Sequence, residues 1–316
     1  MSVADLYTFA WRHAAKVPEP VLRAAGTLAA DAVWLRRGAG VRRLESNYAR
    51  VRPDLDARAV RRLAREGMRR YLRYFREAFT LQALSPEQVT ARVRAEGVEH
   101  VRPTTQAGGA AVLALGHLGN WDLAGAWATP HLAPVLTVAE RLEPPQLYAE
   151  FVAFRRAIGI DVLGLGDDGV FRDLVRGAAD GPRLLPLLSD RDLTATGVEV
   201  DLCGHRARVA AGPAALAVAA DAPLVPVGIR HERLRGERRR RAGSAWGIVI
   251  RFHEPVPCPD GVDRREQIAT MTQGWVDALG AFLRTHTADW HMLQKVFVAD
   301  LDPERYARTR AEAGEV

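Results

Sequence analysis

The stretch Ala110-Ala-Val-Leu-Ala-Leu-Gly-His-Leu-Gly-Asn-Trp-Asp122 decides the fold of this chain. Its first six residues form an apolar run of strand length, and Gly116 and Gly119 surround the histidine that follows. From Asn120 onward the residues favour the opening of a helix. A buried strand that passes through a tight turn into a helix is the unit of open α/β sheets, which bind their substrates at that turn.

The turn carries a histidine five residues before an aspartate. If the helix begins near Asn120, its first turn can direct the Asp122 carboxylate at the imidazole of His117. A neutral imidazole can accept a proton from an alcohol at about pH 7, and a carboxylate on its far nitrogen fixes the tautomer. Backbone N–H groups near Gly119 and Asn120 would then stabilise an oxyanion. The alternative is that Asn120 or Asp122 only caps the helix and His117 is an ordinary loop histidine.

Composition favours one large α/β domain with an anionic partner. The chain has 316 residues, of which 48% are hydrophobic, and a net charge of +6 that is almost entirely arginine because Lys16 and Lys295 are the only lysines. Zinc-ligand spacing is absent and aromatic residues are not interleaved with basic ones, so no metal and no nucleic acid is expected. Cys203 and Cys258 are expected to be reduced thiols, and neither a signal peptide nor a transmembrane helix is expected.

Apolar runs alternate with helical patterns beyond residue 110. We expect strands at residues 110–115, 135–138, 160–163, 184–188, 224–229 and 246–252, and helices at 121–128, 145–158, 170–179, 211–220 and 264–285. This alternation predicts an α/β fold with a mostly parallel central sheet flanked by helices on both faces. A single domain covers residues 1–316, with an α/β core at 85–316 and an arginine-rich loop at 233–241.

The first 84 residues form a helical part before the core. Two short helices are expected in residues 1–37, broken at Pro18-Glu19-Pro20, and a long helix at 56–84. Tryptophan and arginine residues accompany the apolar residues of the first segment. This pattern fits a helical hairpin packed on the domain and equally fits an interfacial anchor on an anionic membrane surface, so both interpretations stay open.

Charged residues also follow other strands of the expected sheet. Asp190 and Asp192 come directly after the apolar run 184–188, and in a parallel sheet this end shares an edge with His117. Charges there are costly unless they are paired or lie in a cleft, so both aspartates are candidate site residues. The alternative is a loop ion pair with Arg191.

Further candidate substrate-binding residues follow the strand at 135–138. Glu140 and Arg141 come just after it, and Arg155 or Arg156 on the next helix could reach an anionic or polyol ligand, the alternative being that each is a surface arginine. The chain has no Gly-x-Ser-x-Gly elbow, and neither cysteine has the setting of a nucleophile. A histidine base without a protein nucleophile suggests that a substrate hydroxyl is the nucleophile.

These motifs resemble a known family. Gly-His-Leu-Gly-Asn-Trp-Asp resembles the H-x4-D/E block of the glycerolipid acyltransferase superfamily, and Ser-Asp-Arg-Asp at 189–192 is similar to the Asp-x-Asp block of its lipid A late acyltransferase branch. Within that branch, Phe-Ala-Trp-Arg-His near the N-terminus, Glu-Arg-Leu-Glu-Pro-Pro at 140–145, Phe-Val-Ala-Phe-Arg at 151–155 and Asp-Trp-His-Met-Leu-Gln-Lys at 289–295 resemble the actinobacterial phosphatidylinositol mannoside acyltransferases.

The resemblance implies a fold like that of glycerol-3-phosphate acyltransferases and a peripheral enzyme on the cytoplasmic face of the plasma membrane. Such an enzyme moves a fatty acyl group, typically palmitoyl, from acyl-CoA to the 6-hydroxyl of a mannose on phosphatidylinositol mannoside. Acyl-CoA is a co-substrate and no bound cofactor is implied. In this chain His117 matches the general base, Asp122 its orienting carboxylate, and Arg155 and Asp190 match positions near the acceptor sugar.

Three other functions remain open at this point. The chain could acylate a different glycolipid or a lysophospholipid, it could hydrolyse a thioester with the same histidine, or it could bind membranes without catalysing a reaction. The sequence leaves undetermined the acceptor, the preferred acyl chain length, the oligomeric state and whether Arg238 to Arg241 contacts lipid.

Overall fold

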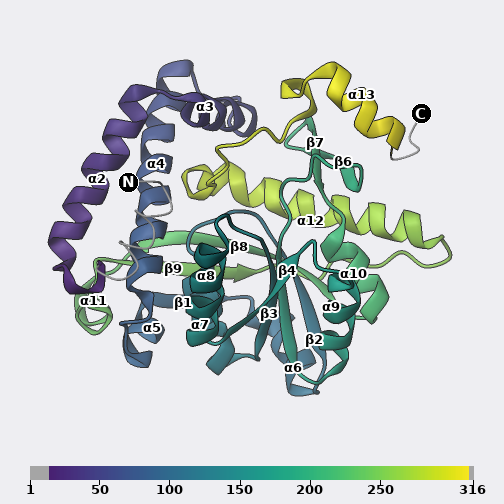
Figure 1. The fold of residues 1–316 in the computed structure, drawn as a ribbon, viewed down its shortest axis with the longest axis horizontal. Coiled ribbons are helices and arrows are strands. Elements are labelled where there is room, and N and C mark those ends of the chain that lie inside the picture. Colours follow the sequence, from purple (N-terminus) through teal and green to yellow (C-terminus); the bar gives the residue numbers. More distant parts are fainter. Residues whose placement is uncertain (1–13, 313–316) are drawn as a thin grey trace.

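The computed structural model describes residues 14–312, and a seven-stranded sheet forms its centre (Figure 1). The strand order is β1-β9-β8-β2-β5-β3-β4. The strands are β1 (Val93–Glu96), β2 (Ala110–Leu115), β3 (Val135–Glu140), β4 (Ile160–Leu165), β5 (Arg183–Leu188), β8 (Leu224–Arg233) and β9 (Trp246–Phe252). Neighbouring strands are parallel except β8 and β9, which confirms the prediction of a mostly parallel sheet.

Helices cover both faces of the sheet, as the sequence predicts. One face carries α7 (Trp121–His131) and α8 (Pro145–Ala157), whose inner residues line a cavity against the strands. The opposite face carries α9 (Val170–Ala179), α10 (Gly212–Ala220) and α12 (Arg264–His286). Since β2 lies between β5 and β8 and is covered on both faces, all six of its residues are buried.

Shorter elements complete the described chain. They are η1 (Ala14–Lys16), α5 (Pro86–Arg92), η2 (Val98–His100), α6 (Arg102–Gln106), η3 (Thr287–Asp289), η4 (Val298–Asp300) and α13 (Pro303–Glu312). β6 (Gly197–Leu202) and β7 (His205–Ala210) form a separate antiparallel hairpin that the sequence analysis did not predict. Positive φ angles of 59° at Cys203 and 87° at Gly204 fit its two-residue turn.

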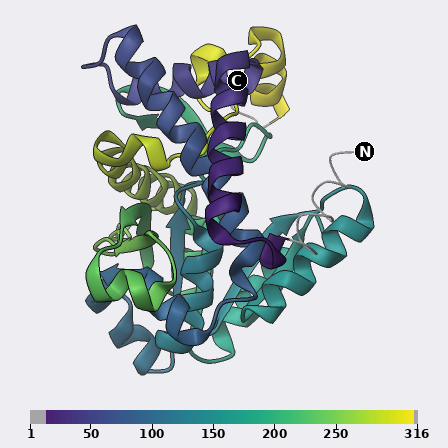
Figure 2. The same ribbon diagram turned by 90° about the vertical axis from the view of Figure 1, so that its left-hand side faces the viewer.

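The N-terminal helices differ from the prediction. α2 (Glu19–Arg36) runs along α4 (Ala57–Leu81) on the outside of the molecule, and α3 (Ala39–Val51) joins them (Figure 2). Pro18 separates η1, which ends at Lys16, from α2, which begins at Glu19, so the predicted break falls at this place, and Pro20 is tolerated in the first turn of α2. α3 was not predicted. The first short helix expected in residues 1–37 falls mainly on residues 1–13, outside the described residues.

The arginine-rich segment at 233–241 is not the predicted loop. β8 extends to Arg233, and α11 (Gly236–Ala242) is a helix, since arginine is a good helix former and Gly243 ends it with a left-handed conformation. Three of its four arginines form ion pairs within the protein: Arg238 pairs with Glu232, Arg240 with Glu237 and Arg241 with Glu87. Across residues 14–312 there is no helix with both the length and the apolar character needed to cross a bilayer.

Candidate active site

His117 and Asp190 stand at matching places beyond two neighbouring parallel strands. β2 ends at Leu115 and β5 ends at Leu188, and these two residues are paired in register. The histidine follows the first strand end by two residues and the aspartate follows the second by two residues. The register of β2 with β5 therefore brings the two side chains together at the carboxyl edge of the sheet.

The pair is closely hydrogen-bonded. The Nδ1 of His117 lies 2.6 Å from Oδ1 of Asp190, and the His117 backbone N–H donates to Oδ2 of the same carboxylate at 2.9 Å. The carboxylate is fully buried, whereas the imidazole side chain is 39% exposed. Within residues 14–312 no hydrogen bond engages the His117 Nε2, so with Nδ1–H donated to Asp190 this nitrogen can accept a proton.

Both groups have perturbed pKa values. Burial disfavours the imidazolium, but the Asp190 carboxylate more than offsets this and raises the pKa of His117 above 6.5. Burial would also raise the pKa of Asp190, but the charge of His117 and hydrogen bonds from His117 and Trp290 hold it below its ordinary value. The pairing therefore favours the ionised form of Asp190 and the protonated form of His117.

Asp122 does not orient His117, and this prediction is corrected. Its buried carboxylate accepts hydrogen bonds from the Tyr74 hydroxyl at 2.8 Å and from Nε of Arg155 at 2.8 Å. The first turn of α7 directs Asp122 toward α8 and α4, where the guanidinium of Arg155 supplies the charge that a buried carboxylate needs. The H-x4-D spacing therefore joins His117 to a residue of a buried ion pair that lies apart from the imidazole.

Gly119 and Asn120 are engaged inside the protein. The N–H of Gly119 donates to the Asp289 carbonyl at 3.0 Å, so the expectation that it stabilises an oxyanion is wrong. A side chain at Gly119 would strain a φ of 56° and approach the Ile229 carbonyl oxygen to 2.8 Å. Asn120 is fully buried, caps α7 by accepting the Leu123 N–H at 3.0 Å, and donates to Glu77 at 3.0 Å.

The two aspartates after β5 have different roles. Asp190 is the hydrogen-bond partner of His117, a role that the sequence analysis gave to Asp122. That Asp190 lies near the acceptor sugar stays a prediction. The Asp192 carboxylate accepts the Thr194 N–H at 2.8 Å, and its own N–H donates to the Arg208 carbonyl at 3.0 Å. Asp192 therefore shapes the loop that leads into β6, and neither aspartate forms the ion pair with Arg191 that was the alternative.

The remaining predicted residues lie around this edge. Glu140 is exposed at the end of β3, and its carboxylate adds to the raised pKa of His117. Arg141 is exposed and pairs with Asp167. Arg155 is buried, and its guanidinium lies 4.3 Å from the centre of the Phe151 ring. That these three residues contact substrate stays a prediction.

An apolar cavity opens between α7 and the sheet. It contains about 620 Å³ of space not filled by protein atoms, part of it open to solvent, and side chains of β2, β5 and β8 form its floor. Trp121, Asp122 and Arg155 also line it. The Trp121 ring stands edge-on to the His117 imidazole, with centroids 5.7 Å apart, so the cavity reaches the immediate surroundings of His117.

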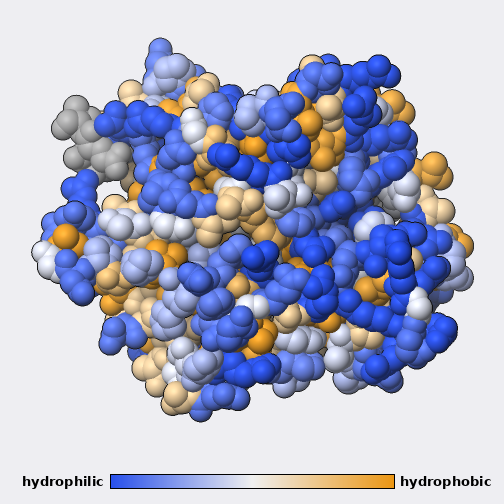
Figure 3. Space-filling model, turned by 180° about the vertical axis from the view of Figure 1, so that it is seen from behind, coloured by the Kyte–Doolittle hydropathy of each residue, from blue (hydrophilic) through white to orange (hydrophobic). Residues whose placement is uncertain are grey.

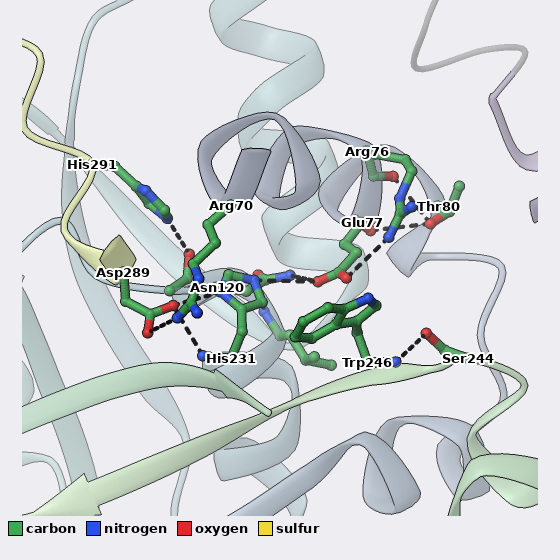
Figure 4. Close-up of polar contacts among 12 residues, drawn as sticks. Arg70, Arg76, Glu77, Thr80, Asn120, His231, Ser244, Trp246, Asp289 and His291 are labelled. Atoms are coloured by element: carbon green, nitrogen blue, oxygen red, sulfur yellow. Dashed lines mark hydrogen bonds and ion pairs between the residues drawn. The ribbon is translucent and has the colours of Figure 1, made fainter. Parts of the chain in front are cut away.

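A buried polar network supports the turn from behind (Figure 4). Asp289 is contacted by Nδ1 of His231 at 2.8 Å and by Arg70 at 2.5 Å, and Glu77 of α4 accepts from Asn120. Burial would raise the pKa of Asp289, but His231 and Arg70 hold it below its ordinary value. Sequence reasoning missed this network, since its members come from four segments that are far apart in the chain.

The segment 289–291 was also missed as part of the site. The sequence offered one signal, the run Asp-Trp-His after the last long helix, which was quoted only for the family resemblance. Within the described residues, no group of three or more histidine, cysteine, aspartate or glutamate side chains is arranged to hold a metal ion.

Comparisons with known proteins identify the family of this chain. The family model "Bacterial lipid A biosynthesis acyltransferase" matches residues 2–298. A protein named phosphatidylinositol mannoside acyltransferase from Mycolicibacterium smegmatis is 37% identical over 309 residues, covering 97% of this chain and 95% of that one. One of the same name from Mycobacterium tuberculosis is 34% identical, covering 96% of this chain and 92% of that one.

A solved structure, the 1-acyl-sn-glycerophosphate acyltransferase PlsC from Thermotoga maritima, covers 66% of this chain and 80% of its own at 15% identity and a TM-score of 0.34, which is too distant to assign anything here. The family model and the curated relatives each extend over nearly the whole chain. They confirm the resemblance that the motifs indicated. The chain therefore belongs to the bacterial lipid A biosynthesis acyltransferase family.

Proposed function

We propose that this protein transfers a long-chain fatty acyl group, palmitoyl above all, from acyl-CoA to a mannose 6-hydroxyl of phosphatidylinositol mannoside. The observation that carries the proposal is the His117–Asp190 pair beside an apolar cavity. The names of the relatives support the acceptor. The cavity supports a long apolar acyl chain, because burying each methylene contributes about 0.8 kcal/mol.

The proposed reaction is a direct transfer without an acyl-enzyme. Nε2 of His117 takes the proton of the sugar hydroxyl while Nδ1–H stays hydrogen-bonded to Asp190, which stabilises the imidazolium that forms. The sugar oxygen attacks the thioester carbonyl, a carbon–oxygen bond forms, and the carbon–sulfur bond breaks. The imidazolium then gives its proton to the departing CoA thiolate. His117 thus begins and ends the cycle neutral.

Positive side chains at the same edge are proposed to bind the CoA phosphates. Arg191 follows Asp190 directly, and its charge lowers the pKa of His117, which puts it close to the imidazole. Arg141 is 60% exposed near the end of β3. Guanidinium groups bind phosphate oxygens in a bidentate manner, so half-buried Arg191 and exposed Arg141 suit an acyl-CoA.

We propose further that α2 contacts the cytoplasmic face of the plasma membrane. Val21, Leu28 and Leu35 are 56%, 71% and 65% exposed and follow one another at intervals of seven residues, which puts them on one face of the helix. Exposed arginines at 36 and 37 accompany them. On the face seen from behind in Figure 3, hydrophobic residues appear only in scattered groups among hydrophilic ones.

The test is a transfer assay with the purified protein, palmitoyl-CoA and phosphatidylinositol mannoside, in which products are identified by mass spectrometry. The wild-type protein should form an acylated mannolipid, and His117→Ala should lose this activity while remaining folded. His205→Ala, an exposed histidine on the β6–β7 hairpin, is the matched control and should keep it. If free fatty acid formed equally well without an acceptor, the protein would instead be a hydrolase. If an acylated product formed only with another lipid, that lipid would be the acceptor in place of phosphatidylinositol mannoside.

A further inference from the structure

Trp290, from a distant part of the chain, contacts the Asp190 carboxylate. It follows η3 directly and is fully buried. Its indole N–H, the only polar group of the side chain, donates to Oδ2 of Asp190 at 2.7 Å. A hydrogen bond of this length to an ionised, buried carboxylate is among the stronger ones that a neutral donor makes.

The backbone around Trp290 is tied to the turn that carries His117. The Asp289 carbonyl accepts the Gly119 N–H at 3.0 Å, the His291 N–H donates to the His117 carbonyl at 2.8 Å, and Trp290 forms a β-bridge with Leu118. One segment therefore holds the histidine's turn by its backbone and the aspartate by a side chain, so the two partners are positioned against a common support.

We infer that Trp290 is a positioning residue that holds Asp190 with Oδ1 facing Nδ1 of His117. The inference depends on the proposed role of the His117–Asp190 pair. The Oδ2 atom accepts only the His117 N–H and the Trp290 indole among the described residues. Without the indole, one donor remains to fix Oδ2, and the carboxylate is held less firmly in the orientation that keeps the His117 tautomer in place.

The indole also sets the basicity of the pair. A hydrogen bond donated to a carboxylate favours its ionised form, so its loss makes Asp190 a stronger base that holds the imidazolium more tightly. Because catalysis needs neutral His117, the acid side of the pH profile of kcat/KM should then move to higher pH. A side chain that merely filled the core would leave this profile in place.

The test compares Trp290→Phe with Trp275→Phe in the full-length protein. Trp275 is the matched control because it is equally buried but its indole N–H has no partner within the described residues. Trp290→Phe should lower kcat roughly ten- to hundredfold, which corresponds to the free energy of one hydrogen bond to a charged group. It should leave KM for palmitoyl-CoA within about twofold and move the acid side of the pH profile to higher pH. Trp275→Phe should leave both kcat and the acid side of the profile unchanged.

The inference would be overturned if the folded Trp290→Phe protein kept both the kcat and the acid side of the pH profile of the wild type. If that variant does not fold, ¹⁵N-tryptophan spectra of the wild type decide: one indole N–H signal should titrate with the midpoint of the acid side of the profile and cease to titrate in Asp190→Asn. The inference fails if no indole signal does so. A wild-type protein that transfers no acyl group would instead contradict the proposed function, while the indole titration would still report on Trp290.

Discussion

At the scale of single residues, the proposed function predicts that Asp190, the partner of His117, sets the pH dependence of activity. Asp190 raises the pKa of His117, so the neutral base is lost as pH falls through a value above 6.5, and wild-type kcat/KM should decline with a midpoint there. Asp190→Asn removes the charge that stabilises the imidazolium. Its midpoint should lie at lower pH, and kcat should fall roughly 10⁴-fold because the tautomer is no longer fixed. Profiles of kcat/KM from about pH 5 to pH 9 measure both effects.

Asp122→Asn is the matched control for this experiment. Asp122 bonds to Tyr74 and Arg155 and makes no contact with His117, so its replacement should leave the midpoint where it is, whatever happens to kcat. If Asp122→Asn moved the midpoint and Asp190→Asn did not, the carboxylates would have exchanged roles and the sequence-based pairing would stand.

Arg155 and Asp122 form an ion pair whose side chains are only 7% and 2% exposed. Arg155→Met should lower the free energy of unfolding by about 3–5 kcal/mol, because it leaves an uncompensated charge in an apolar cavity. The double variant Asp122→Asn with Arg155→Met should recover most of that loss. Urea denaturation of the wild type, the two single variants and the double variant measures this double-mutant cycle. An Arg155→Met protein whose free energy of unfolding lies within about 1 kcal/mol of the wild type would contradict a stabilising ion pair.

At the scale of secondary-structure elements, the fit of α7 on the sheet creates the cavity. Its inner face presents small residues, Ala124, Gly125 and Ala128, where larger side chains would fill the space against the strands. A Cβ at Gly125 would stand 2.5 Å from Ile160 Cδ1, at a narrow point of the lining. The length of acyl chain that fits should therefore depend on this helix.

Gly125→Leu should shorten the preferred acyl chain. Each methylene excluded from the cavity costs about 0.8 kcal/mol, about fourfold in kcat/KM, so a loss of three should lower the rate with palmitoyl-CoA roughly fiftyfold. The rate with decanoyl-CoA should change little. Competition between acyl-CoAs of different length, read by mass spectrometry, measures the preference.

Ala278→Leu is the matched control for Gly125→Leu. Ala278 lines a smaller cavity of about 190 Å³ on the opposite face of the sheet, under α12, so an added side chain there should leave chain-length preference unchanged. A wild-type preference in a folded Gly125→Leu protein would mean that the acyl chain does not enter the cavity under α7.

At the scale of the whole molecule, the exposed stripe on α2 should govern membrane binding. Leu28→Glu together with Leu35→Glu replaces two side chains that are 71% and 65% exposed with charges that anionic lipid repels. A fully buried leucine contributes about 1.5–3 kcal/mol, so two partly inserted leucines contribute enough that their replacement should weaken vesicle binding at least roughly tenfold. Cosedimentation with phosphatidylinositol vesicles at low and high salt measures this.

The control for α2 is Leu165→Glu, which alters an exposed leucine, 51% accessible, on β4. It should bind vesicles as the wild type does. Binding unaffected by the α2 double variant would move the membrane-contacting surface elsewhere, while transfer to a detergent-dispersed acceptor should persist in both variants because neither touches the His117–Asp190 pair.

Much of the molecule could be predicted from local patterns. The alternation of apolar runs with helical segments correctly predicted the sheet, because strand and helix periodicities are properties of neighbouring residues. The α11 helix was missed because its residues are mostly arginine, so no apolar periodicity marks it, and its arginines pair with distant residues such as Glu87. The β6–β7 hairpin did carry a signal, since Val198, Val200 and Leu202 alternate with acidic residues, but the sequence analysis did not use it.

The sequence by itself determined that His117 stands in a turn between a buried strand and a helix, and that Asp190 ends another buried strand. Only the tertiary structure decided which carboxylate meets the imidazole. The register of β2 with β5 and the arrival of Trp290 depend on contacts between residues far apart in the chain, whereas the H-x4-D spacing records only a separation along it. A short separation does not make two side chains face each other when a helix turns one of them toward Arg155.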